Sequence, residues 1–242
     1  RDLRLADNPA LRAALNGSEQ VIPVYIHAPD EESPWQPGGA SRWWLHHSLQ
    51  RLEAALARRG ARLVIARGNS LPALRALIAQ TGARRCVWNR LYDPATVARD
   101  TAVKQALRAD GVQCESHNGA LLFEPWEVKT GAGEPYKVFS AYWRRAGARL
   151  TDTAEPLPAP PALPPVPDSM DSLPLEALEL LPRIRWDTGL ADTWQPGEDG
   201  AHDRLERFLG GPIGRYGEAR DLPAEAGTSR LSAHLHWGEI TP

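Results

Sequence analysis

The chain has 242 residues, of which 42% are hydrophobic and 24% charged, and its formal net charge is −2 at pH 7. This is ordinary composition for a globular protein with one large or two modest domains. No apolar run approaches the roughly 20 residues that a membrane span needs, and no signal peptide begins at Arg1, so we expect a cytoplasmic protein without a membrane partner. Outside residues 151–200 the chain is weakly basic, which is compatible with nucleic acid but does not require it.

Residues 8–118 alternate between helical and strand-like patterns. Asn8 is the expected cap of the first helix, and Pro9 suits its first turn. Strands separated by helices of this length predict a Rossmann-like parallel α/β sheet with helices on both faces. Because polar residues 1–7 open the series, we expect a further strand upstream of Arg1. The predicted strands are 21–28, 62–67, 84–89 and 112–118, and the predicted helices are 9–15, 41–60, 70–82 and 94–111.

The two cysteines, Cys86 and Cys114, lie in apolar, strand-like contexts. Two cysteines so placed favour buried free thiols in a reducing compartment over a disulfide. We therefore expect both thiols to be free, in agreement with a cytoplasmic location.

A proline-rich and acidic stretch follows the alternating series. Residues 156–167 hold seven of the 22 prolines, and residues 151–200 carry ten acidic but only two basic side chains. This composition predicts an extended surface linker, for which a disordered spacer and a packed crossover are equal alternatives.

After residue 200 the hydrophobic residues again follow helical spacing. We expect an α/β domain over 1–150, an interdomain linker over 151–199 and the start of an all-α domain over 200–242.

Near the carboxyl end, a tight bend is combined with small hydroxyl side chains. Gly227 permits the bend, and Arg230 adds a cation. Thr228, Ser229 and Ser232 supply three hydroxyls just before an expected helix start. Such a loop suits an anion, most often a phosphate. The alternative is a plain capping loop, because Ser and Thr cap helices in many proteins.

Five motifs stand out along the chain: RDLRLADNPAL, SRWWLHHSL, WNRLYDP followed by ARD, GEPYKVFSAYWRR, and YGEARDLPAEAGTSRLSAHLHWGEITP. In this order they resemble the landmarks of the DNA photolyase and cryptochrome family, with the first strand missing. The resemblance spans essentially the whole chain. As a set the motifs are very specific, whereas singly only GTSRLS is.

The resemblance implies both a fold and a chemistry. The family has an N-terminal α/β domain that can hold a light-harvesting antenna, a long connector, and a C-terminal helical domain that encloses FAD. Its repair members use light-excited reduced FAD to split cyclobutane pyrimidine dimers in UV-damaged DNA, after the lesion is flipped out of the duplex. We therefore expect a monomeric, FAD-dependent carbon–carbon lyase that acts in DNA repair.

The resemblance also assigns roles to single residues. Tyr216 matches the tyrosine at the edge of the flavin site, and Arg220 matches an arginine on the DNA-facing surface. For Arg220, a surface ion pair with Asp221 or Glu218 is an equal alternative. The loop that holds the FAD phosphates through backbone and hydroxyl groups matches Thr228, Ser229, Arg230, Leu231 and Ser232.

The sequence does not identify the antenna chromophore. Members with a folate antenna carry an Asn-Glu pair after the Tyr-acid landmark, whereas Ala95 and Thr96 occupy these positions here. This departure leaves a folate bound in another way, a deazaflavin, or no antenna as alternatives. Trp43 and Trp44 could line an antenna pocket, but packing of their helix against the core is favoured.

Other aromatic and histidine residues are assigned to packing. Tyr136, Phe139 and Trp143 follow helical spacing and are expected in the core. His234 and His236 are two residues apart, so on a helix their rings point to different faces, which is poor for a shared metal. We expect helix packing beneath the flavin loop instead.

Three functions from different classes compete. They are a light-driven DNA repair lyase, a cryptochrome-type blue-light photoreceptor without repair, and a nucleotide-binding α/β module without photochemistry. In the family, the flavin-ring pocket and the lesion-binding residues lie in the C-terminal half. Since Thr241-Pro242 reads as a helix start, we expect this chain to be part of a larger protein, truncated at both ends and inactive alone.

Overall fold

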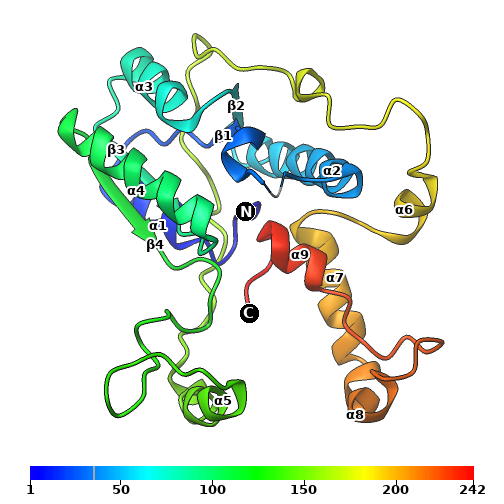
Figure 1. The fold of residues 1–242 in the computed structure, drawn as a ribbon. Helices are drawn as coiled ribbons and strands as arrows, with labels where there is room; N and C mark the ends of the chain where they lie inside the picture. Colours follow the sequence, from blue (N-terminus) through cyan, green and yellow to red (C-terminus); the bar gives the residue numbers. More distant parts are fainter. Residues whose placement is uncertain (35) are drawn as a thin grey trace.

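The computed structural model describes residues 1–34 and 36–242, apart from the side chain of Asp152. Helices and strands alternate through the first half, as predicted, and shorter helices follow in the second (Figure 1). None of the described helices is long and apolar enough to cross a bilayer. The helices are α1 (Pro9–Leu15), α2 (Gly39–Ala57), α3 (Ser70–Thr81), α4 (Pro94–Ala109), α5 (Phe139–Gly147), α6 (Thr188–Thr193), α7 (Glu198–Leu209), α8 (Tyr216–Ala219) and α9 (Ser232–Trp237); the strands are β1 (Val24–His27), β2 (Val64–Arg67), β3 (Arg85–Asn89) and β4 (Gln113–His117).

The four strands form two parallel pairs. In the first pair β1 lies beside β2, with Val24 opposite Val64. In the second, β3 lies beside β4, with Arg85 opposite Gln113. Helices α2 and α4 make the two crossovers, as parallel strands require. The predicted parallel α/β class is confirmed, but among the described residues the strands make two small sheets rather than one continuous sheet.

Local sequence signals account for the ends of several helices. The side chain of Asn8 accepts a hydrogen bond from the backbone N–H of Leu11 at 3.0 Å, so it is the predicted cap of α1. Gly82 ends α3 in the left-handed conformation at φ 65°, which costs glycine little because it has no Cβ. These helix ends follow from sequence alone.

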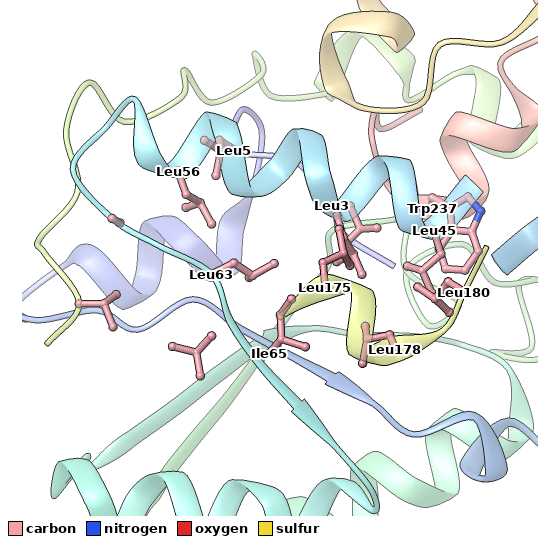
Figure 2. Packing of buried hydrophobic residues seen from close by; sticks show 14 of the residues in the cluster. Leu3, Leu5, Leu45, Leu56, Leu63, Ile65, Leu175, Leu178, Leu180 and Trp237 are labelled. Atoms are coloured by element: carbon pink, nitrogen blue, oxygen red, sulfur yellow. The ribbon is translucent and has the colours of Figure 1, made fainter. Parts of the chain in front are cut away.

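The main hydrophobic core forms along α2. Its Leu45, Leu49 and Leu56 are at most 2% exposed and pack among residues of β2, the N-terminal segment and the stretch 163–180 (Figure 2). Trp43 and Trp44 are 2% and 6% exposed and belong to the same cluster. The prediction that these two indoles pack into the core is confirmed.

Part of the proline-rich stretch is packed rather than free. Leu163, Val166 and Met170 are each 6% exposed and lie in the main core. The backbone N–H of Leu163 donates to Arg59 O at 2.8 Å, and that of Leu173 donates to Ile65 O at 2.9 Å. Of the two alternatives, the packed crossover describes residues 163–180. In Figure 1 this stretch passes from the α/β part toward α6.

The prediction that Phe139 and Trp143 lie in the core is wrong. Phe139 is 74% exposed and Trp143 46% exposed, and their rings stack on each other on the surface of α5. The opposite face of α5, which carries Ala146, packs into a small hydrophobic cluster. The half-buried Tyr136 packs against the same cluster. Helical spacing placed the aromatic residues on one face but did not decide which face would be covered.

Both cysteines are free, as predicted, and they are register partners in the β3–β4 pair. Burial raises the pKa of Cys86 to about 12 and also raises the pKa of Cys114. Both thiols are therefore held in the protonated, unreactive form at neutral pH.

We predict that iodoacetamide alkylates Cys86 of the native protein at pH 8 at least roughly a hundredfold more slowly than a free cysteine, and Cys114 also more slowly, because only the thiolate reacts and burial raises the pKa of both thiols. Mass spectrometry of the two cysteine peptides measures the rates. The same chain in urea is the control and should react quickly. Equal rates in the native and unfolded chain would contradict the raised pKa values.

Candidate functional site

The predicted phosphate loop runs from Gly227 to Ser232, between α8 and α9. Gly227 is buried against α8: a Cβ at this position would lie 2.4 Å from the carbonyl oxygen of Ala219, so only glycine fits. Arg230 has a φ of 53°, in the left-handed region that non-glycine residues rarely adopt. The close contact with Ala219 fixes the bend and brings the loop against the helix that carries Tyr216.

The polar groups of this loop are not used within the chain. Among the described residues, the hydroxyls of Thr228, Ser229 and Ser232 form no hydrogen bond, and α9 has no side-chain cap. The backbone N–H groups of 228–231 likewise have no partner there. In a plain capping loop, a hydroxyl oxygen would accept a hydrogen bond from a backbone N–H in the first turn of the helix. Among the described residues the loop's donors are therefore not used in capping α9, and they are exposed or half-buried.

A buried carboxylate anchors the helix that follows the loop. Glu239 and His234 are both 0% exposed, and Glu239 Oε2 lies 2.5 Å from His234 Nδ1. The other oxygen, Oε1, accepts from Trp44 Nε1 at 3.0 Å and from the backbone N–H of Gly197 at 2.7 Å. One side chain thus connects α9 with α2 and with the start of α7.

The prediction that both histidines pack beneath the loop holds for His234 and is wrong for His236. His234 lies in the core beside Trp44, whereas His236 is exposed on another face of α9. Among the described residues, no group of three or more His, Cys, Asp or Glu side chains is placed to hold a metal.

The first residues of the chain complete the anchoring of α9. Arg4, 2% exposed, donates to the carbonyl oxygens of Asp7, Gly119 and Gly238. Burial lowers its pKa. Gly238 has a φ of 64°, and a Cβ there would lie 2.1 Å from Arg1 O, so the close approach requires glycine. The motif at the start of the sequence therefore supports the motif at its end.

Sequence reasoning missed Arg4 and Glu239 as structural residues. A signal was present for Glu239, because it directly follows a short aromatic helix and the glycine that ends it. A carboxylate next to apolar residues that need burial is a candidate for a buried polar partner.

Tyr216 and Arg220 lie together on α8 and just after it. Tyr216 is 42% exposed and packs edge-on against Phe208 of α7. The guanidinium of Arg220 lies 5.8 Å from the Tyr216 ring centre and 3.6 Å from the Asp221 carboxylate. The ion pair anticipated as an alternative is therefore present. Because both partners are more than half exposed, it contributes little and leaves the guanidinium accessible.

Of the two residues at the positions of the family's Asn-Glu pair, Thr96 is buried and Ala95 is half-buried. Thr96 is 2% exposed, and its hydroxyl donates to Asp93 O at 2.9 Å within the first turn of α4. Ala95 and Thr96 therefore present neither the amide nor the carboxylate that an Asn-Glu pair would supply at this turn.

Comparison with known proteins agrees with the motifs. The family model described as DNA photolyase matches residues 1–162, so the chain belongs to the DNA photolyase family. The whole chain is 44% identical to a deoxyribodipyrimidine photo-lyase of Agrobacterium fabrum and 38% identical to cryptochrome-1 of Arabidopsis thaliana, covering 50% and 35% of them. The crystal structure of a bacterial class III photolyase from Agrobacterium tumefaciens matches 99% of the chain with a TM-score of 0.93 at 44% identity; 49% of that structure is covered. The chain spans about half the length of the photo-lyase relatives.

We predict that Glu239→Ala lowers the free energy of unfolding by about 3–5 kcal/mol, because it leaves His234 and two N–H donors buried without their partner. Urea unfolding monitored by far-UV circular dichroism measures the change.

Glu225→Ala is the matched control, since Glu225 forms an exposed pair with Arg215 at 3.4 Å. This variant should change stability by less than about 1 kcal/mol. Equal effects of the two substitutions would show that the Glu239 network does not anchor α9.

Proposed function

We propose that the chain supplies the α/β part and the flavin phosphate loop of a deoxyribodipyrimidine photo-lyase, which splits cyclobutane pyrimidine dimers in UV-damaged DNA with FAD and light. One observation carries the proposal. In a chain that is 44% identical over its whole length to a photo-lyase, the loop with the family's most specific motif leaves its hydroxyls and amides free.

The loop is suited to the diphosphate of a dinucleotide. The free N–H groups of 228–231 and three hydroxyls surround one bend, and Arg230 adds a positive charge. Each hydrogen bond to a charged group contributes about 1.5–3 kcal/mol, so three or four of them would fix a diphosphate. When bound, FAD supplies the light-driven electron transfer, while these residues bind and orient it.

Tyr216 and Arg220 extend this assignment from the loop to its surroundings. Tyr216 is held against Phe208 and remains 42% exposed, which suits a wall at the edge of a flavin site. We infer that the accessible Arg220 contacts a DNA phosphate, because a duplex attracts exposed guanidinium groups. Its pair with Asp221 is weak enough to be exchanged for a phosphate.

We predict that a chimera of residues 1–242 with the C-terminal half of the Agrobacterium fabrum photo-lyase binds FAD and repairs dimers under blue light. The double variant Thr228→Val/Ser232→Ala should lower its FAD affinity at least about tenfold, because two charge-assisted donors are removed. Flavin absorbance of the purified protein and a dimer-repair assay measure the two effects. Thr101→Val/Ser140→Ala, which removes hydroxyls from α4 and α5, is the matched control and should change neither.

Two results would contradict this account. A chimera that holds FAD but shows no light-dependent repair would favour the photoreceptor function, and unchanged FAD affinity in the double variant would separate the loop from the flavin. Pyrophosphate binding by the 242-residue chain and by its double variant gives a readout that does not depend on the chimera.

We predict that Arg220→Gln weakens binding of dimer-containing DNA by the chimera and reduces the salt slope by about 0.9, as expected for one lost phosphate contact. FAD content should not change. Arg215→Gln is the control, because Arg215 is similarly exposed and paired. Equal DNA affinity and salt slope in the two variants would contradict a role of Arg220 at the DNA surface.

A further inference from the structure

Helix α5 carries an aromatic surface that takes no part in the proposed flavin site. Phe139 is 74% exposed and Trp143 46% exposed, and the neighbouring Val138 is 61% exposed. The ring centres of Phe139 and Trp143 are 6.2 Å apart and the ring planes are inclined by only 12°, so the two rings lie nearly parallel. Large apolar side chains that gather on a surface mark interaction sites. Phe139 and Trp143 are named the α5 aromatic pair below.

The helix and its neighbours hold the α5 aromatic pair in place. The ring centre of the half-buried Tyr142 lies 6.4 Å from that of Phe139 and 6.4 Å from that of Tyr136, and both tyrosines pack against the small cluster under α5. A Cβ at Gly147 would lie 3.8 Å from Cε2 of Trp143, so the indole contacts the next turn of the helix. Rings that are fixed before binding lose little conformational entropy when a partner stacks on them.

The segment that carries the pair is strongly basic. Residues 135–149 contain four basic side chains and no acidic one, although the net charge of the chain is −2. Lys137, Arg144 and Arg145 are exposed, and they form no hydrogen bond or ion pair within the part of the chain that the structure describes. Arg149 instead donates to a backbone carbonyl oxygen at 3.2 Å. Three cations beside the aromatic pair are therefore available to a negatively charged partner.

This combination favours single-stranded nucleic acid over other partners. Aromatic rings stack on bases that are unpaired, and cations contact the phosphates between these bases. A second copy of the chain would bring two sets of the same cations together, and like charges oppose such a contact. In Figure 1, α5 lies at the lower end of the view, as does α8, the helix that directly precedes the proposed DNA contact Arg220.

We propose that α5 is a second DNA-binding surface, which binds a single-stranded segment of DNA. Bases stack on the α5 aromatic pair, and the adjoining phosphates accept hydrogen bonds from Lys137, Arg144 and Arg145. The choice of DNA rests on the proposed photo-lyase function. The surface itself goes beyond that function, because neither the phosphate loop nor Arg220 belongs to it. Unpaired bases arise where a lesion is flipped out of the duplex.

Fluorescence anisotropy of a labelled oligothymidylate, titrated with the 242-residue chain, tests the proposal. We expect saturable binding that is at least about tenfold weaker in Phe139→Ala/Trp143→Ala, because base stacking is lost. Phe139→Tyr/Trp143→Phe keeps both rings and should bind within about threefold of the original chain. Ile184→Ala/Trp186→Ala is the matched control, since these two side chains are 81% and 49% exposed on the linker, and it should not change the affinity.

The phosphate contacts have a separate readout. Arg144→Gln/Arg145→Gln should reduce the slope of log affinity against log salt by about 1.4, because each phosphate contact on a single strand contributes about 0.7. Arg58→Gln/Arg183→Gln removes two exposed arginines elsewhere and should leave the slope unchanged. An oligomer of abasic deoxyribose phosphates should bind the original chain at least about tenfold more weakly than oligothymidylate does, because it has no bases to stack.

The chimera with the C-terminal half tests the surface in a protein of full length. Phe139→Ala/Trp143→Ala should weaken its binding of dimer-containing DNA and leave its FAD content unchanged. Three outcomes would overturn the proposal: absent or unchanged oligothymidylate binding in the comparison of the original chain with this variant, phosphatidylserine vesicles that displace the oligothymidylate from the chain, or unchanged DNA affinity of the variant chimera. If Arg220→Gln weakens DNA binding by the chimera while the α5 variant does not, the α5 surface alone is refuted and the photo-lyase function stands.

Discussion

The carboxylate of Glu239 is the interaction on which the geometry of the candidate site depends. A six-residue helix such as α9 is too short to be stable by itself, so its position must come from tertiary contacts. Glu239 provides them by joining His234, Trp44 and Gly197 in one buried, hydrogen-bonded group. Because α9 begins directly after the predicted phosphate loop, Glu239 anchors the helix at one end of that loop, while the contact of Gly227 with Ala219 fixes its other end.

The two ends of the sequence are held together around this group. The buried Arg4 donates to Gly238 O, and the backbone N–H of Leu3 donates to Trp237 O at 3.2 Å. Glu198, at the start of α7, accepts from the backbone N–H groups of Leu5 and Ala6. The N-terminal segment thus contacts α9 and α7 directly. The motifs at opposite ends of the chain therefore form one packed unit.

Sequence patterns predicted the regular elements well, since helix period, caps and strand runs are local properties. The helices of residues 9–109 and the four strands were found in order, and Asn8 caps α1 as expected. The remaining features depend on contacts between distant segments. Glu239 and Arg4 are charged residues, which are usually exposed, so only their partners show that they are buried. Phe139 has the spacing of a core residue yet is exposed, because that face of α5 has no covering element among the described residues.

The central claim is that the loop at 227–232 binds the diphosphate of FAD. A crystal structure of the chimera with FAD tests it most directly. The account predicts diphosphate oxygens at about 2.7–3.2 Å from the N–H groups of 228–231 and from the hydroxyls of Thr228 and Ser232. A structure in which FAD lies elsewhere, while these hydroxyls bond only to their own backbone, would contradict it.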